Sequence, residues 1–140
     1  MSIVKPFKGG AKAFDWQQID RDTLPLVKDA IKQLQGDGKS RPKKVTVFTV
    51  ERLLNLPSKR ITLYLPMCKA EIDKYQETQE QYWAREIVWA VRKIIREGGT
   101  LNWKHIRNLT NMKKEDMIAS MPELQRIATD DMVELVKSLI

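Results

Sequence analysis

One hydrophobic pattern occurs twice in this chain, and the second copy follows the first at a constant offset of 56 residues. Without gaps, this offset aligns apolar residues with apolar residues, an asparagine with an asparagine and a proline with a proline. The aligned pairs are Val45 with Leu101, Val47 with Trp103, Val50 with Ile106, Leu53 with Leu109, Asn55 with Asn111, Leu56 with Met112, Ile61 with Met117, Leu65 with Met121 and Pro66 with Pro122. Repetition of this kind predicts two copies of one supersecondary unit.

Within each copy the apolar residues recur at helical spacing, and strand-like alternation is nearly absent. The sequence therefore predicts an all-α fold of two tandem helix-turn-helix-like trihelical units around a shared long central helix. That central helix is expected at about 78–97, where apolar residues cover three sides. The other helices are expected at about 20–35, 45–56, 58–65, 67–75, 102–111, 113–121 and from 129 onward. All six prolines are expected near helix ends or in loops.

The expected organisation has three segments. Residues 1–14 contain three lysines and a Gly-Gly pair but few apolar residues, so they are expected to form a flexible basic arm. The first unit is expected at 15–76, and the second unit with a C-terminal helix at 77–140. A chain of 140 residues has no room for a catalytic domain beside a separate recognition domain, which favours a binding module.

The charge of the chain is unevenly distributed along the sequence. The net charge is +7, and residues 1–70 carry 14 Lys+Arg against 6 Asp+Glu, whereas residues 71–140 carry 11 against 12. A bound polyanion would therefore be attracted most strongly to the cations of the first half. These cations include Lys39, Arg41, Lys43, Lys44, Lys59 and Arg60. A solvated charged face with a basic tail is the alternative interpretation.

In a helix-turn-helix unit the second helix enters the major groove, so polar and cationic residues around the two turns are the candidate DNA contacts. The predicted contacts are Lys43, Lys44, Thr46, Thr49, Ser58, Lys59, Arg60, Thr62, Asn102, Lys104, His105, Arg107, Lys113, Lys114 and Ser120. Glu115 and Asp116 are unfavourable near phosphates, so the first unit is expected to contribute more of the binding. A helical repeat that binds another protein remains the alternative, and it predicts an exposed apolar patch on the C-terminal helix. An RNA-binding protein is less favoured because most aromatic residues are expected in the core.

The sequence contains none of the usual signatures of catalysis. His105 is the only histidine, no serine or cysteine lies in a nucleophile motif, and neither Gly-Gly pair belongs to a phosphate-binding loop. Cys68 is the only cysteine, so no intrachain disulfide or cysteine metal site is expected. We therefore expect no enzyme activity, no cofactor and no metal, and a monomeric cytoplasmic protein without membrane segments.

Several short motifs resemble the C-terminal DNA-binding region of TnsD-type (TniQ-related) proteins, which select target sites for bacterial transposons. The similar residues are spread over about 15–110. They are Asp15-Trp16 with Asp20, Lys44-Val45-Thr46 with Val50 and Arg52, Leu65-Pro66 with Lys69-Ala70, Arg85, Ile87, Trp89-Ala90, Thr100, Trp103 and Arg107. The chain departs from the family at Ile19, where an arginine is expected, and it has no zinc-binding Cys/His cluster.

The resemblance implies sequence-specific binding to double-stranded DNA at a chromosomal attachment site. It further implies hand-off to a transposon-encoded ATPase regulator that recruits the transposase. The missing zinc-binding region implies either an excised domain or a shortened relative. The alternative that remains open is a helical adaptor that docks a transposition regulator or a host factor.

Overall fold

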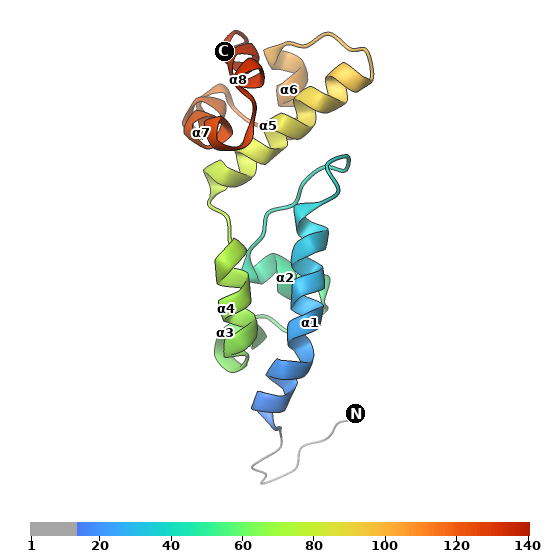
Figure 1. Cartoon of the computed structure of the whole chain (residues 1–140), viewed down its shortest axis with the longest axis vertical. Coiled ribbons are helices and arrows are strands. Elements are labelled where there is room, and N and C mark those ends of the chain that lie inside the picture. The colour runs from blue at the N-terminus through green and yellow to red at the C-terminus, as the bar shows by residue number, and fades with distance from the viewer. Residues whose placement is uncertain (1–13) are drawn as a thin grey trace. The chain divides into compact units, whose positions relative to one another are not determined.

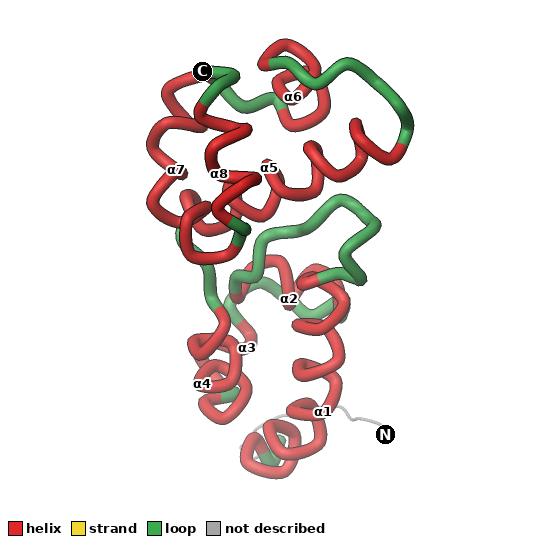
Figure 2. The backbone as a smooth tube through the Cα atoms, turned by 45° about the horizontal axis from the view of Figure 1, so that its top comes forward, coloured by secondary structure: helices red, strands yellow, loops and turns green. Residues whose placement is uncertain are grey.

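The computed structural model describes residues 14–140, so the predicted arm at 1–14 lies almost entirely outside the described residues. Those described residues form eight α-helices and no strand, which confirms the all-α class (Figures 1 and 2). The helices are α1 Trp16–Gln35, α2 Val47–Leu53, α3 Arg60–Tyr64, α4 Pro66–Tyr75, α5 Gln79–Arg96, α6 Trp103–Thr110, α7 Lys114–Ile127 and α8 Asp130–Lys137. None of these helices is long and apolar enough to cross a membrane.

The chain divides into two compact units. Of the described residues, the first contains 14–32 and 45–76, and the second contains 33–44 and 77–140. The loop that precedes α2 thus belongs to the second unit by its contacts. It carries four Lys+Arg against one Asp+Glu, whereas 77–140 carries ten of each, so the second unit holds +3 of the +7 charge. The described residues of the first unit hold +1, and the sequence at 1–13 carries the remaining +3. Charge is therefore shared between the units, although it is concentrated in the first half of the sequence.

The first unit packs α1, α2, α3 and α4 around a core of aliphatic side chains. Its buried residues include Val27, Val50, Ile61 and Ile72, which come from all four helices. Helical spacing places each of these residues on the inward face of its helix. Burial of one such side chain contributes about 1.5–3 kcal/mol to stability.

Helix α1 begins earlier than the sequence predicts. The expected start was near Asp20, but the helix starts at Trp16 because Asp15 caps it, with Oδ1 accepting a hydrogen bond from the Gln18 backbone N–H at 3.1 Å. Aspartate is a strong N-cap because its short side chain reaches an otherwise unpaired backbone donor. Asp20 therefore lies inside the helix, where its side chain has a different role.

The second unit is built around α5, which packs against α6 and α7. Ala84, Ile87, Ala90, Val91 and Ile94 are buried on its inner face, together with residues of α6, α7 and α8. The two tryptophans of α5 are partly buried against this core, as expected for packing residues. Ile95 is 58% exposed, so the helix is not buried on all three of its apolar sides.

Two prolines contradict the expectation that all of them mark helix ends or loops. Pro25 lies inside α1 and Pro122 inside α7, whereas Pro66 opens α4. Both internal prolines are exposed, so water can hydrogen-bond the carbonyl that loses its helical partner. The two prolines that align at the 56-residue offset therefore differ in their positions. Pro66 begins a new helix, whereas Pro122 lies within a helix that continues beyond it.

Candidate nucleic-acid interface

The start of the short helix in each unit has the same local geometry. Thr46 accepts a hydrogen bond from the Thr49 backbone N–H at 3.1 Å, and Asn102 accepts one from the His105 backbone N–H at 2.8 Å. Both are N-caps, and they are separated by 56 residues. A capped start fixes the direction in which each short helix leaves its preceding loop.

The end of each short helix also has a matching residue. Asn55 has φ +57° and Asn111 has φ +61°, so both adopt the left-handed conformation 56 residues apart. Asparagine adopts this conformation more readily than other residues with a side chain, and it reverses the chain after a helix. Beyond these turns, Ile61 and Met117 are both fully buried at equivalent positions. The cap, the turn and the first core contact of the next helix therefore recur in the structure.

A buried carboxylate that the sequence analysis missed organises the turn of the first unit. Glu51 of α2 is buried, and its two oxygens accept hydrogen bonds from the backbone N–H groups of Lys59 at 3.3 Å and Ile61 at 3.0 Å. These donors open α3, which has no side-chain cap of its own. Lys59 adopts φ +67°, an uncommon conformation for a lysine, and its side chain is exposed. The turn thus holds a cation at the surface in a strained backbone conformation.

A second buried carboxylate joins α1 to α4. Asp20 is 2% exposed and accepts hydrogen bonds from the backbone N–H groups of Met67 at 2.8 Å and Cys68 at 3.0 Å. Leu65 occupies the N-cap position of α4 and cannot cap it, so the acceptor comes from another helix. Burial, and secondarily the hydrogen bond to Asp20, raises the pKa of the Cys68 thiol to about 12, which keeps this cysteine protonated and unreactive.

The predicted contacts of the first unit differ in how accessible they are. Ser58, Lys59 and Thr62 are exposed. Arg60 is half-buried and lies over the Trp16 ring, 5.2 Å from its centre, and that ring stacks on Tyr64 at 4.3 Å. Arg60 therefore stabilises the packing of α3 on α1 as well as contributing charge.

The predicted threonines and lysines at the start of α2 and just before it differ in their contacts. The hydroxyls of Thr46 and Thr49 lie 3.0 Å apart within the cap of α2. Lys44 donates to the Gln79 side chain at 2.9 Å, whereas the side chain of Lys43 is exposed. By their contacts these two lysines belong to the second unit. Of the residues predicted around α2, Lys43 is thus the most available to a ligand.

In the second unit the predicted cations lie on the surface. Their side chains are exposed and form no ion pair in the part of the chain that the structure describes. These cations are Lys104, Arg107, Lys113 and Lys114. Asn102 uses its side chain as a cap, and Nδ1 of His105 lies 3.1 Å from the Thr100 carbonyl oxygen.

Ser120 is a wrong prediction, because its side chain is fully buried. Its hydroxyl donates a hydrogen bond to the Met117 carbonyl at 2.8 Å, so it faces the core. The outer face of α7 instead presents Ile118 and Ala119, which the sequence analysis did not single out. Ile118 follows Lys114 by four residues and Ala119 follows Glu115 by four, so each lies on the same face as an exposed charged residue, which is a signal that the sequence already contains.

Asp116 has a structural role that explains an acidic residue at this surface. Its Oδ2 accepts a hydrogen bond from the Lys113 backbone N–H at 2.9 Å, at the start of α7. A carboxylate is favourable there because unpaired N–H groups give the helix start a partial positive charge. The hydrogen bond of Asp116 to the helix start therefore reduces its expected repulsion of phosphates. Glu115 is an exposed anion, so its repulsion remains.

The basic loop at 36–44 is tied to α5. The Arg85 guanidinium pairs with Glu77 at 2.6 and 2.7 Å and also donates to the carbonyls of Gln35 at 3.2 Å and Lys43 at 2.7 Å. Arg41 pairs at 2.5 Å with Glu86, whose side chain is buried, and this pairing raises the pKa of Arg41. The charge of Arg41 is thus already balanced, and this loop offers a polyanion fewer cations than its composition indicates.

No protein-family model, curated protein or solved structure matches this chain.

Proposed function

We propose that this chain binds double-stranded DNA through two helix-turn-helix-like units in tandem. The observation that carries the proposal is the recurrence, 56 residues apart, of a capped short helix and a left-handed asparagine turn. In both units exposed lysines stand at the start of the helix that follows this turn. A short helix, a turn and a second helix form the arrangement that places the second helix in the major groove.

In this proposal each unit uses lysines for phosphate contacts and another side chain for base contacts. Lys59, Lys113 and Lys114 contact phosphates, which supplies affinity without reading sequence. Thr62 of α3 and Ile118 of α7 lie on exposed positions three to five residues after these lysines and contact base edges. A hydroxyl can bond to several bases, and an aliphatic side chain packs on the thymine methyl group.

We further propose, from the family resemblance, that the DNA is a target site of a bacterial transposon and that a transposon-encoded ATPase regulator is the next partner. Several residues that carry the resemblance have structural roles. Asp20 caps α4, Thr46 caps α2 and Arg85 anchors the basic loop. The resemblance therefore supports a fold that this chain shares with the family. In this proposal the exposed residues of the turns determine which DNA sequence is bound.

A protein-interaction adaptor is the second candidate. The apolar patch it predicts on α8 is small, since Val133 and Val136 are buried and Leu135 is only 37% exposed. The first unit, however, exposes large apolar side chains, including Phe48 at 58% and Leu63 at 64%. Exposed apolar groups of this size favour contact with another protein.

The proposal is tested by the salt dependence of binding to a fluorescent random-sequence duplex. Each phosphate contact contributes about −0.9 to the slope of log K against log salt concentration. With five to six exposed cations around the turns, we expect a slope of about −5. A slope near zero would contradict DNA binding, and tighter binding to structured RNA in a competition assay would instead favour the RNA alternative.

A further inference from the structure

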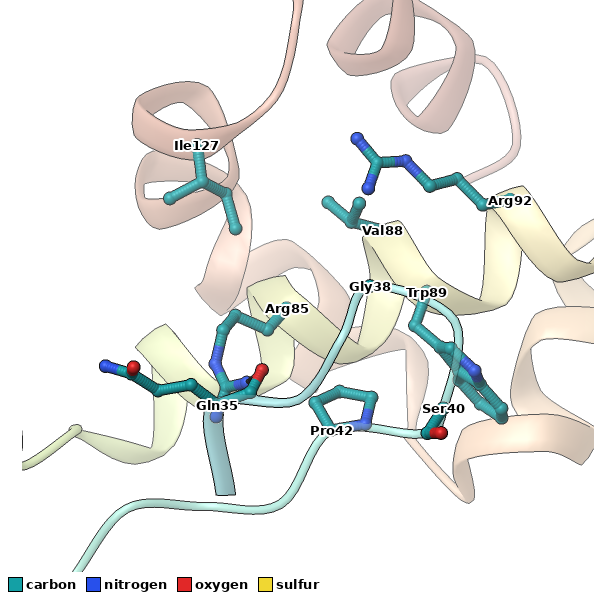
Figure 3. Close-up of a pocket in the computed structure, with 9 residues that line it drawn as sticks. All are labelled: Gln35, Gly38, Ser40, Pro42, Arg85, Val88, Trp89, Arg92 and Ile127. Carbon is teal, nitrogen blue, oxygen red and sulfur yellow. Dashed lines mark hydrogen bonds between the residues drawn. The ribbon is translucent and has the colours of Figure 1, made fainter. Parts of the chain in front are cut away.

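The second unit contains a pocket that the proposed DNA contacts do not use. Its volume is about 210 Å³, and it lies between the loop at 35–42, one face of α5 and the last residue of α7 (Figure 3). Its lining residues are Gln35, Gly38, Ser40, Pro42, Arg85, Val88, Trp89, Arg92 and Ile127. All of them belong to the second unit.

The size of this pocket limits what it can bind. Sites for cofactors and small-molecule substrates usually enclose about 300–1,000 Å³. A pocket of about 210 Å³ is too small for most of them and large enough for one bulky side chain. The walls suit an apolar group, since Pro42, Val88, Trp89 and Ile127 supply much of the lining.

The loop side of the pocket is held in place by hydrogen bonds. Arg85 ties the loop to α5 through two carbonyls, and the Trp89 indole N–H donates to the Lys39 carbonyl at 3.2 Å. The Trp89 indole N–H is thus already paired, and the charge of Arg85 is already balanced by Glu77. A wall that is fixed before binding loses little conformational freedom when a ligand enters.

Arg92 is the one cation of the lining whose charge has no described partner. Its guanidinium extends over Val88 in Figure 3, and it takes part in no ion pair within residues 14–140. Asp37 is the one acidic residue of the loop at 36–44, and it already accepts hydrogen bonds from the backbone N–H groups of Lys39 at 2.8 Å and Ser40 at 2.9 Å. An apolar pocket beside an unpaired guanidinium is complementary to an apolar group that carries a carboxylate close by.

We propose that this pocket binds a segment of a partner protein in which a bulky aliphatic side chain adjoins a glutamate or aspartate. The aliphatic side chain enters the pocket, and the carboxylate pairs with Arg92. Ile127 and Lys114 are at opposite ends of α7, about 20 Å apart at 1.5 Å per residue. A peptide in the pocket therefore leaves the lysines at the start of α7 free, so the inference does not depend on DNA binding.

The test is a titration of the isotope-labelled full chain, followed by NMR, with an acetylated tetrapeptide that contains leucine followed by glutamate. We expect the Trp89 indole and the Val88 methyl signals to shift on binding. Replacing the glutamate of the peptide by glutamine, or making the Arg92→Gln variant, should weaken binding about threefold to fivefold, as for an exposed ion pair. Replacing the leucine by alanine should abolish the shifts of the pocket signals.

Arg96→Gln is the matched control, because Arg96 is an exposed arginine of the same helix that does not line the pocket. This variant should bind the peptide like the parent protein. The inference is overturned if the pocket signals do not move, if Arg92→Gln and Arg96→Gln weaken binding equally, or if glutamine in the peptide binds as well as glutamate. It is also overturned if a short duplex DNA shifts the same pocket signals, since the site would then belong to the nucleic-acid surface.

Discussion

Replacing Asp20 with alanine is expected to lower the free energy of unfolding by about 3 kcal/mol. The substitution removes the acceptor of two backbone N–H groups, those of Met67 and Cys68, in a site where Asp20 is buried. A buried donor left without a partner costs about 1–3 kcal/mol, because it has given up its hydrogen bonds to water. Chemical denaturation of the full chain, monitored by circular dichroism, measures the loss.

Two further variants separate the hydrogen bonds from the charge. Asp20→Asn keeps one side-chain carbonyl oxygen and should cost about 1 kcal/mol, because it still satisfies one of the two donors. Asp22→Ala is the matched control on the same helix, since Asp22 is exposed and accepts a hydrogen bond from the exposed Gln18 side chain, and it should change stability by less than about 0.5 kcal/mol. Equal losses for Asp20→Ala and Asp22→Ala would show that the buried cap contributes nothing specific.

A triple variant, Lys59→Gln with Lys113→Gln and Lys114→Gln, is expected to weaken duplex DNA binding on the order of 30-fold at low salt. The slope of log K against log salt concentration should become shallower by about 3, because each lysine that contacts a phosphate contributes close to one unit. All three side chains are exposed, so the free energy of unfolding should change little. Fluorescence anisotropy across a salt series measures both the affinity and the slope.

The control removes the same charge elsewhere. Lys28, Lys32 and Lys137 are exposed lysines of α1 and α8, and the variant with glutamine at all three should keep most of its affinity and slope. Equal losses in the two triple variants would show that net charge, and not the proposed surface, controls binding. Arg60 is left unchanged because its contact with the Trp16 ring is worth about 0.5–1 kcal/mol, so its removal would also loosen the fold.

Signals that lie within one helix could be predicted from the sequence. Thr46, Asn102 and Thr129 were expected near helix starts from their position before apolar periodic segments, and each one is an N-cap in the structure. The periodicity of α5 correctly placed most of its buried face. These features depend on residues that are only a few positions apart in the sequence, so the sequence alone is enough to predict them.

Features that depend on distant partners could not be predicted. Asp20 and Glu51 are acidic residues within helices, and nothing in their neighbours indicates that they cap α4 and α3. Pro122 carries a strong helix-stop signal that is overridden because α7 packs along α5 and exposes its ring. Tertiary packing therefore decided which local signals took effect.

The same reason limited the prediction of the candidate site. A basic residue type gives no information about its partner, so Arg41 counted as an available cation although it pairs with the buried Glu86. Ser120 counted as a surface hydroxyl although the face of α7 that carries it is buried. Lys59 and Lys114, in contrast, are exposed as expected, because they adjoin turns whose neighbours are polar.

The most direct measurement of the central claim is NMR mapping of a short duplex DNA onto the labelled full chain. We expect the largest amide shifts in two groups that are related by the 56-residue offset, at about 58–62 and 114–118. Shifts in both groups that disappear at high salt would match two DNA-reading helices. Shifts confined to residues outside both groups, or no shifts at low salt, would contradict the claim.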